Sequence, residues 1–155
     1  MEKKNLKYFM RDTKDEIVTA PGPDSFKDEN GKVINFEIKV LSQETINKIN
    51  EAYRKRSMAT DKKGNPLIAM GEVVWKVEKD NARASRHIIA ESLQYPNLKD
   101  PELMKYYNCA DMTEMPLKVF SRADEYQHVS RIVMQALGLM ETQDDDEELD
   151  AAKNL

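Results

Sequence analysis

The apolar residues of one N-terminal segment alternate with polar residues, which predicts a strand. From residue 32 to 40 every second side chain is apolar, and this face consists of Ile34, Phe36, Ile38 and Val40. A period of two is typical of a half-buried strand. The dipeptide Asn30-Gly31 just before it is favoured in type I′ turns, so we expect a short hairpin that reaches back to residues 25–27.

The apolar spacing changes to a helical period after Leu41. Ser42 is a suitable N-cap for a helix from Gln43 to Arg56, and Leu41 can pack on Ile46 as a hydrophobic staple. The apolar stripe of this helix is narrow and consists of Ile46, Ile49 and Tyr53. We therefore expect one buried face and one charged face.

Residues 57–80 contain both turn signals and β-prone residues. The run from Asp61 to Pro66 predicts a turn between two short extended pieces, which would form a mobile hairpin or loop. The β-prone residues that follow lead directly into a helical pattern and are Val73, Val74, Trp75 and Val77. We predict a helix that begins between Gly71 and Asp80, and a strand stays open as the alternative for this stretch.

Helix signals continue through the C-terminal half. They predict helices from about residue 81 to 94, from 101 to 107, from 113 to 120 and from 122 to 137. Asp100-Pro101 places an N-cap before a proline at the first helical position. Ser121 is the expected cap of the last helix, with Asp124 at position N3 and Gly138 as the C-cap.

Together these elements predict a mainly α fold with a minor β part. We expect one compact helical domain of about five helices over residues 26–140, with the strand or hairpin at its N-terminal end. Pro21-Gly22-Pro23 interrupts regular structure, so residues 1–25 are predicted to form an extended N-terminal arm. Residues 141–155 are predicted to form an acidic, disordered tail.

The net charge of −4 comes from that tail. Residues 136–155 hold seven of the 28 acids and one of the 24 bases, so their balance is −6. The other residues hold 21 acids and 23 bases, a balance of +2. A run of like charge with few apolar residues cannot offset the entropy lost on ordering, which is why we expect disorder after Met140.

The composition excludes several classes of protein. Charged residues make up 34% of the 155 residues, and no run approaches the ~20 apolar residues that a membrane span needs. No apolar signal segment follows Met1, so we expect a cytoplasmic protein. Cys109 is the single cysteine, which excludes an internal disulfide and a multi-thiolate zinc site.

The residues that could carry chemistry form no recognisable motif. His87 and His128 lie on separate predicted helices, and neither has a second metal ligand three or four positions away. Cys109 would need a nearby histidine to act as a nucleophile. No glycine loop precedes Lys-Ser or Lys-Thr, and residues 144–148 lack the spaced acids of a calcium loop. We predict no enzymatic activity, no metal and no cofactor.

One local basic group is the only sign of nucleic-acid binding. It consists of Arg54, Lys55, Arg56, Lys62 and Lys63. Because it lacks interleaved aromatic residues and a recognisable motif, we interpret it as a solvated helix end and turn rather than a nucleic-acid site.

Methionines and tyrosines gather in the C-terminal half. Five of the nine methionines lie between Met104 and Met140. Methionine is flexible and polarizable, so an exposed group suits apolar partners of varied shape, whereas a buried group would only fill a small helical core. The candidate partner-binding residues are Met104, Tyr106, Tyr107, Met112, Met115, Tyr126 and Met134.

The same half contains short motifs in a characteristic order. They are Tyr95-Pro96-Asn97-Leu98, Asp100-Pro101-Glu102-Leu103 leading to Tyr106-Tyr107-Asn108, Ser121-Arg122-Ala123-Asp124-Glu125-Tyr126, and Val133-Met134-Gln135-Ala136-Leu137-Gly138-Leu139. This order resembles the phage XkdN-like tail assembly chaperones over residues 35–140. In that family a helix ends in a Pro-Asp/Asn-Leu turn, a Glu-Leu helix ends in Tyr, and a helix opened by a Gly-Glu-Tyr type start closes in a Gly-Phe type cap.

The resemblance implies a non-enzymatic role in building the tail of a phage or phage-like particle. It implies that several copies bind the tape measure protein, keep it soluble and give way as tail tube subunits polymerise around it. Self-association and contact with the tail tube protein are expected from the same resemblance. The alternatives are a small nucleic-acid-binding regulator with a basic patch, and a permanent structural component of the tail.

Overall fold

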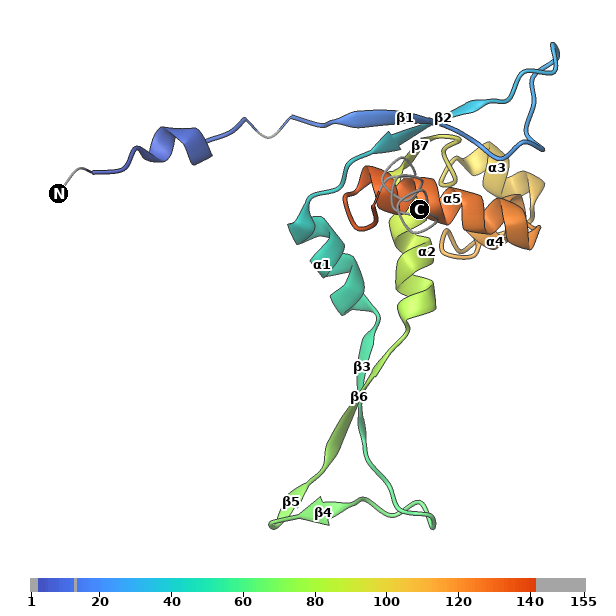
Figure 1. Cartoon of the computed structure of the whole chain (residues 1–155). Helices are drawn as coiled ribbons and strands as arrows, with labels where there is room; N and C mark the ends of the chain where they lie inside the picture. Colours follow the sequence, from blue (N-terminus) through green and yellow to red (C-terminus); the bar gives the residue numbers. More distant parts are fainter. Residues whose placement is uncertain (1–2, 13, 142–155) are drawn as a thin grey trace, which may run out of the picture.

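The computed structural model describes residues 3–12 and 14–141 of the chain. The predicted acidic tail lies outside these residues, apart from Glu141. Within the described part, a body of helices on a small sheet carries two segments that extend away from it, the N-terminal residues and a long β-hairpin (Figure 1). No helix in this part is long and apolar enough to cross a membrane.

The sheet of the body has three antiparallel strands in the order β1-β2-β7. β1 spans Ile17–Pro21, β2 spans Asn35–Lys39 and β7 spans Leu93–Tyr95. The predicted alternation of β2 is confirmed, because Phe36 and Ile38 are buried while the polar residues between and beside them are more exposed. β1 lies within residues 1–25, for which the sequence predicts an extended arm. The antiparallel pairing of β1 with β2 was not predicted.

The hairpin predicted at Asn30-Gly31 is also confirmed. Lys27 and Val33 form an antiparallel bridge across it. Gly31 adopts φ +77°, a left-handed conformation that glycine takes without steric cost. The turn brings Phe26 back beside β2, where its ring makes an edge-to-face contact with Phe120 at 5.8 Å between centroids.

Five α-helices and one 3₁₀-helix lie in the described residues. They are η1 (Leu6–Phe9), α1 (Gln43–Ala52), α2 (Asn81–Ser92), α3 (Pro101–Tyr106), α4 (Met115–Val119) and α5 (Ala123–Ala136). Ser42 caps α1 as predicted, since its Oγ accepts a hydrogen bond from the Thr45 backbone N–H at 3.1 Å. Asp100 caps α3 in the same way, through a 2.9 Å bond from the Glu102 N–H.

The cap of α5 differs from the predicted one by a residue. Arg122 is the N-cap, and the carboxylate of Glu125 at N3 accepts its backbone N–H at 3.1 Å. The prediction of Ser121 as N-cap and Asp124 at N3 is therefore wrong by one residue. The predicted C-cap is confirmed, because Gly138 has φ +75° and the backbone bonds of a Schellman motif end the helix.

A β-hairpin projects from the body between α1 and α2, and we call residues 54–79 the projecting hairpin (Figure 1). β3 (Arg54–Met58) pairs with β6 (Trp75–Lys79), and a smaller pair, β4 (Ile68–Ala69) with β5 (Glu72–Val73), lies at the far end. The base of this hairpin is closed by a backbone hydrogen bond of 3.1 Å from Asp80 to Tyr53.

Three predictions for this region are wrong. The first helix ends at Ala52 rather than Arg56, the residues from 72 to 79 form strands rather than a helix, and the basic residues 54–56 lie on a strand rather than at a helix end. Trp75 and Val77 pair across the ribbon with β3, and Val73 pairs with β4. Asp80 starts α2 by accepting the Arg83 N–H at 3.1 Å.

The prediction of a mainly α fold is therefore wrong as well. Helices hold 37% and strands 22% of the structure, which makes the fold α+β. One of the strands that was not predicted, β7, joins β2 across more than fifty residues of chain. Such pairing leaves little trace in a local apolar period.

The core lies between the sheet and helices α2 and α5. One buried cluster joins Phe36 and Ile38 of β2 with Ile89 of α2 and Val133 of α5. Within the described part of the chain, this buried cluster contains no residue of the projecting hairpin. The body thus has its own core, and the projecting hairpin is mounted on it.

Candidate partner-binding surfaces

The seven predicted partner-binding residues do not form one exposed surface. Met115 is fully buried and Tyr106 is 80% exposed. The other five are partly buried and pack against the core, namely Met104, Tyr107, Met112, Tyr126 and Met134. Burial also raises the pKa of the Tyr126 phenol. In this conformation Tyr106 is the predicted residue that a partner can reach most fully.

An apolar cavity of about 220 Å³ lies beside this region. Its lining joins the sheet to helices α3 and α4 and consists of Phe26, Ile34, Phe36, Tyr95, Pro96, Leu103, Tyr107, Val119 and Phe120. Tyr107 is the one predicted residue in the lining, and its ring makes an edge-to-face contact with Tyr106 at 5.0 Å. This volume suits a single apolar side chain of a partner.

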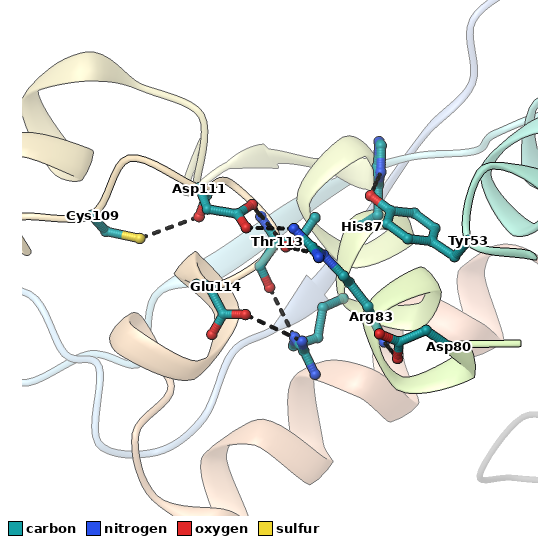
Figure 2. Close-up of polar contacts among 9 residues, drawn as sticks. Tyr53, Asp80, Arg83, His87, Cys109, Asp111, Thr113 and Glu114 are labelled. Atoms are coloured by element: carbon teal, nitrogen blue, oxygen red, sulfur yellow. Dashed lines mark hydrogen bonds and ion pairs between the residues drawn. The ribbon is translucent and has the colours of Figure 1, made fainter. Parts of the chain in front are cut away.

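Polar contacts hold the loop between α3 and α4 onto α2 (Figure 2). Arg83 of α2 donates to the Asp111 carboxylate at 2.7 Å and to the Thr113 hydroxyl at 3.2 Å. Arg86, one turn further on, donates to the Thr113 carbonyl at 2.9 Å and reaches Glu114 at 3.3 Å. The two arginines therefore set the position of the segment that carries Met112 and Met115.

Asp111 has a lowered pKa in this network. The Thr113 hydroxyl and backbone N–H both donate to the carboxylate, and the Arg83 guanidinium adds a favourable charge. Cys109 lies next to this aspartate, with its Sγ 3.2 Å from the Asp111 carbonyl. These contacts have a structural role, since they close the loop.

Both histidines make structural contacts as well. His87 Nδ1 lies 2.6 Å from the Tyr53 hydroxyl, which ties α2 to the end of α1 (Figure 2). His128 Nε2 donates to the Pro21 carbonyl at 2.8 Å, which ties α5 to the end of β1. Among the described residues, no group of three His, Cys, Asp or Glu side chains is arranged to hold a metal ion.

The projecting hairpin exposes more large apolar side chains than the predicted surface does. Met70 at its tip is fully exposed, and Trp75 and Val77 of β6 are about half exposed. The full set is Met58, Leu67, Ile68, Met70, Val73, Trp75 and Val77. Soluble proteins rarely leave such a group uncovered unless it meets a partner.

The strand register divides the ribbon into two different faces. Directly opposite residues share a face, and alternate residues along a strand do too. One face therefore consists of Arg54, Arg56, Met58, Trp75, Val77 and Lys79. The other face includes the pairs Lys55–Glu78 and Ser57–Lys76. The first face, which we call the Trp75 face, has three bases, three apolar side chains and no acid.

The N-terminal segment is a second exposed apolar element. Its short helix η1 lies away from the body (Figure 1) and has no buried residue. Leu6, Tyr8, Phe9 and Met10 are all more than half exposed.

The projecting hairpin is not among the partner-binding residues predicted from the sequence. A signal was present in residues 75–78, where the apolar residues Trp75 and Val77 alternate with the charged residues Lys76 and Glu78 at the period of a strand. The helical interpretation of residues 71–80 concealed it. A two-faced ribbon with exposed apolar and basic residues is typical of a protein-binding element rather than of an active site.

Comparison with known proteins shows the family of this chain. Residues 6–153 match the family model described as phage XkdN-like tail assembly chaperone protein, TAC. Because the match spans nearly the whole sequence, the chain belongs to this family. The resemblance inferred from the motifs of the C-terminal half is thereby confirmed, and a role in phage tail assembly comes with the family.

Two proteins of Bacillus subtilis (strain 168) are similar along almost their entire length. YqbN is 29% identical over 152 residues, which cover 97% of this chain and 93% of YqbN. The phage-like element PBSX protein XkdN is 27% identical over 152 residues, which cover 97% of this chain and 94% of XkdN. A crystal structure of the protein YqbN shares the fold, with a TM-score of 0.65 at 22% identity over 88% of this chain and 98% of that one.

Proposed function

We propose that this protein acts as a chaperone for the tape measure protein during tail assembly, keeps that protein soluble and releases it as the tail tube forms. The proposed site of action is the host cytoplasm, and the proposed role involves no enzymatic step. The observation that carries the proposal is the group of large apolar side chains held away from the body on the projecting hairpin. These side chains are not part of the buried core. Their exposure is explained if a binding partner covers them.

The physical reason for such a chaperone lies in the client. A long helix with an exposed apolar face aggregates if it is synthesised before the tail tube surrounds it. Reversible binding of an adaptable apolar surface to that face prevents the aggregation. The predicted acidic tail, with a balance of −6 over residues 136–155, would add solubility to the complex.

Further partners follow from the same role. Several copies would act along one client, so we include self-association and contact with the tail tube protein. The predicted surface around Tyr106 and the apolar cavity beside Tyr107 belong to the proposed contact area, together with the other partly buried methionines and tyrosines. We also keep the proposed division into an N-terminal arm 1–25, whose strand β1 pairs with the sheet of the body, a body 26–140 and an acidic tail 141–155.

Co-expression with the tape measure protein from the same genome tests the proposal. We expect a higher soluble yield of the tape measure protein and a complex that survives size-exclusion chromatography in mild salt. An insoluble tape measure protein and no complex would contradict it. Mature particles should lack the protein, whereas a permanent structural component would be present in them.

A nucleic-acid-binding role is the second candidate, because residues 54–79 hold seven bases and three acids. The Trp75 ring that could stack on a base already has the Arg56 guanidinium 4.4 Å from its centroid. Binding to duplex DNA that weakens steeply with salt and is lost when Arg54, Lys55 and Arg56 are replaced would favour this candidate.

A further inference from the structure

We infer that the Trp75 face of the projecting hairpin binds an amphipathic helix whose polar side is acidic. The inference rests on the proposed function, since it names the chemistry of the client segment and the place where it binds. It is carried by three features of the ribbon, namely the exposure of its strands, its dimensions and the charge of this one face.

The strands of the ribbon do not pack into the core of the body. Every residue of β6 is exposed, and four of the five residues of β3 are too. An isolated two-stranded ribbon is marginally stable in water. A third layer on its apolar face would bury Met58, Trp75 and Val77 and hold the strands together.

The ribbon has the length of a short helical segment. Each strand has five residues, which corresponds to about 17 Å of extended chain. A helix of about 11 residues, or three turns, has the same length. Apolar side chains at positions i, i+3, i+4 and i+7 of such a helix would lie along the apolar centre of the Trp75 face.

Charge decides which helix fits. The Trp75 face has Arg54, Arg56 and Lys79 and no acid, and the hairpin as a whole has a balance of +4 from seven bases and three acids. A hairpin of a second copy would carry the same charge and be repelled. Glutamate or aspartate beside the apolar stripe of a helix would instead meet the three bases.

Two of the three bases of this face are available for contacts with carboxylates of a partner. Arg54 forms a 2.9 Å ion pair with Glu51 on α1. Within the described residues, neither Arg56 nor Lys79 has an ion-pair partner. Arg56 lies over the indole of Trp75, a stacking arrangement that leaves the N–H groups at the guanidinium edge for carboxylates.

The acidic tail of the chain itself is a weaker fit. Residues 141–155 supply seven acids but only two large apolar residues, Leu149 and Leu155. They offer charge without the apolar stripe that would cover Trp75. A synthetic peptide of these residues therefore serves as a comparison in the test.

The first experiment uses the full-length protein and two designed peptides. Both are helices of about 18 residues with the same leucine face. One has a glutamate-rich polar face and the other a lysine-rich one. Trp75 is the single tryptophan of the chain, so its emission reports directly on the ribbon.

We expect the acidic peptide to shift the Trp75 emission to shorter wavelength and to bind at least about tenfold more tightly than the basic one. Equal binding of the two peptides would overturn the inference. Equal binding of the acidic helix and the 141–155 peptide would overturn it too, because charge alone would then suffice.

Two charge-reversal variants provide a matched pair. Arg56→Glu and Lys55→Glu change the net charge equally at neighbouring positions of β3, but only the first lies on the Trp75 face. We expect Arg56→Glu to abolish the preference for the acidic peptide and Lys55→Glu to retain it. An equal loss in both variants would overturn the inference. Val77→Thr, which keeps a β-branched residue, should weaken binding of the acidic peptide.

The same pair separates this inference from the proposed function. If the wild-type protein binds the tape measure protein, the Arg56→Glu variant should no longer bind it, whereas the Lys55→Glu variant should still bind it. Retention by Arg56→Glu would overturn the inference while the chaperone function stands. If wild type does not bind the tape measure protein at all, the proposed function fails, and the peptide experiment still judges the Trp75 face.

Discussion

The guanidinium group of Arg56 lies over the indole ring of Trp75, 4.4 Å from the ring centroid. The two residues belong to opposite strands of the projecting hairpin and are diagonal neighbours on one face. This contact joins a cation to the largest apolar side chain of the ribbon. It shows how one exposed surface can offer both apolar area and positive charge.

Removing that guanidinium group should change the environment of Trp75 on the ribbon and leave the stability of the body almost unchanged. We expect Arg56→Ala to alter the Trp75 emission spectrum and to lower the free energy of unfolding by less than about 1 kcal/mol, as is typical of an exposed cation–π pair. Fluorescence and thermal unfolding followed by circular dichroism measure the two effects. Lys55→Ala on the other face is the control. A loss of several kcal/mol would show that the ribbon is part of the core.

Gly22 should tolerate no side chain. A Cβ there would lie 2.5 Å from Cε1 of the buried Phe36 ring and 2.9 Å from the Ile34 carbonyl oxygen. We expect Gly22→Ala to lower the free energy of unfolding by about 3 kcal/mol, the upper part of the range for overpacking. Chemical denaturation measures it.

Gly31→Ala is the comparison for Gly22. Gly31 has φ +77° but open space around the position of a Cβ. Its replacement should cost about 1 kcal/mol from backbone strain alone. Equal losses for the two variants would contradict the tight contact between Gly22 and Phe36.

Asp111 should make stability depend on pH in the acid range. Its folded-state pKa lies below the ordinary value of 3.8, first because Thr113 donates to it and then because Arg83 lies near. The ionised carboxylate therefore stabilises the fold above that value, and the contribution is lost as pH falls through the folded-state pKa.

We expect Asp111→Asn to lower the free energy of unfolding by about 1 kcal/mol near neutral pH. The difference from wild type should shrink once the pH is below about 4. Urea unfolding at a series of pH values measures it, with Asp12→Asn on the exposed N-terminal segment as the control. A difference that grows at low pH would contradict the assigned contacts.

The body should fold without the projecting hairpin. The Asp80 N–H donates to the Tyr53 carbonyl at 3.1 Å, the bond that closes a four-residue turn. Replacing residues 54–79 by Asn-Gly should therefore join α1 to α2 directly. We expect the free energy of unfolding to change by less than about 1 kcal/mol, because a shorter loop offsets the few lost contacts. Loss of cooperative unfolding would contradict an independent body.

Local signals predicted the parts of the fold that local physics determines. The alternation around Phe36, the caps at Ser42 and Asp100 and the glycine at position 138 all act within a few residues. The failures lie where a distant partner decides the structure. Residues 75–79 precede a helical pattern and contain β-prone residues, and their pairing with β3 selects the strand.

The partner surface could be predicted only in part for the same reason. Composition pointed to methionine and tyrosine in the C-terminal half, but packing buries Met115 completely and most of the others in part. The exposure of a side chain depends on the whole fold and cannot be derived from the number of methionines and tyrosines. The apolar face of the ribbon appears only after β3 and β6 are placed in register.

The yield of tape measure protein that co-purifies with the chain tests the central claim most directly. Wild type and the variant in which Asn-Gly replaces residues 54–79 are compared after co-expression with the tape measure protein. We predict a stable complex for wild type and less than about a tenth as much for the variant, although the variant is folded. Equal amounts with both proteins would contradict the claim that the projecting hairpin holds the client.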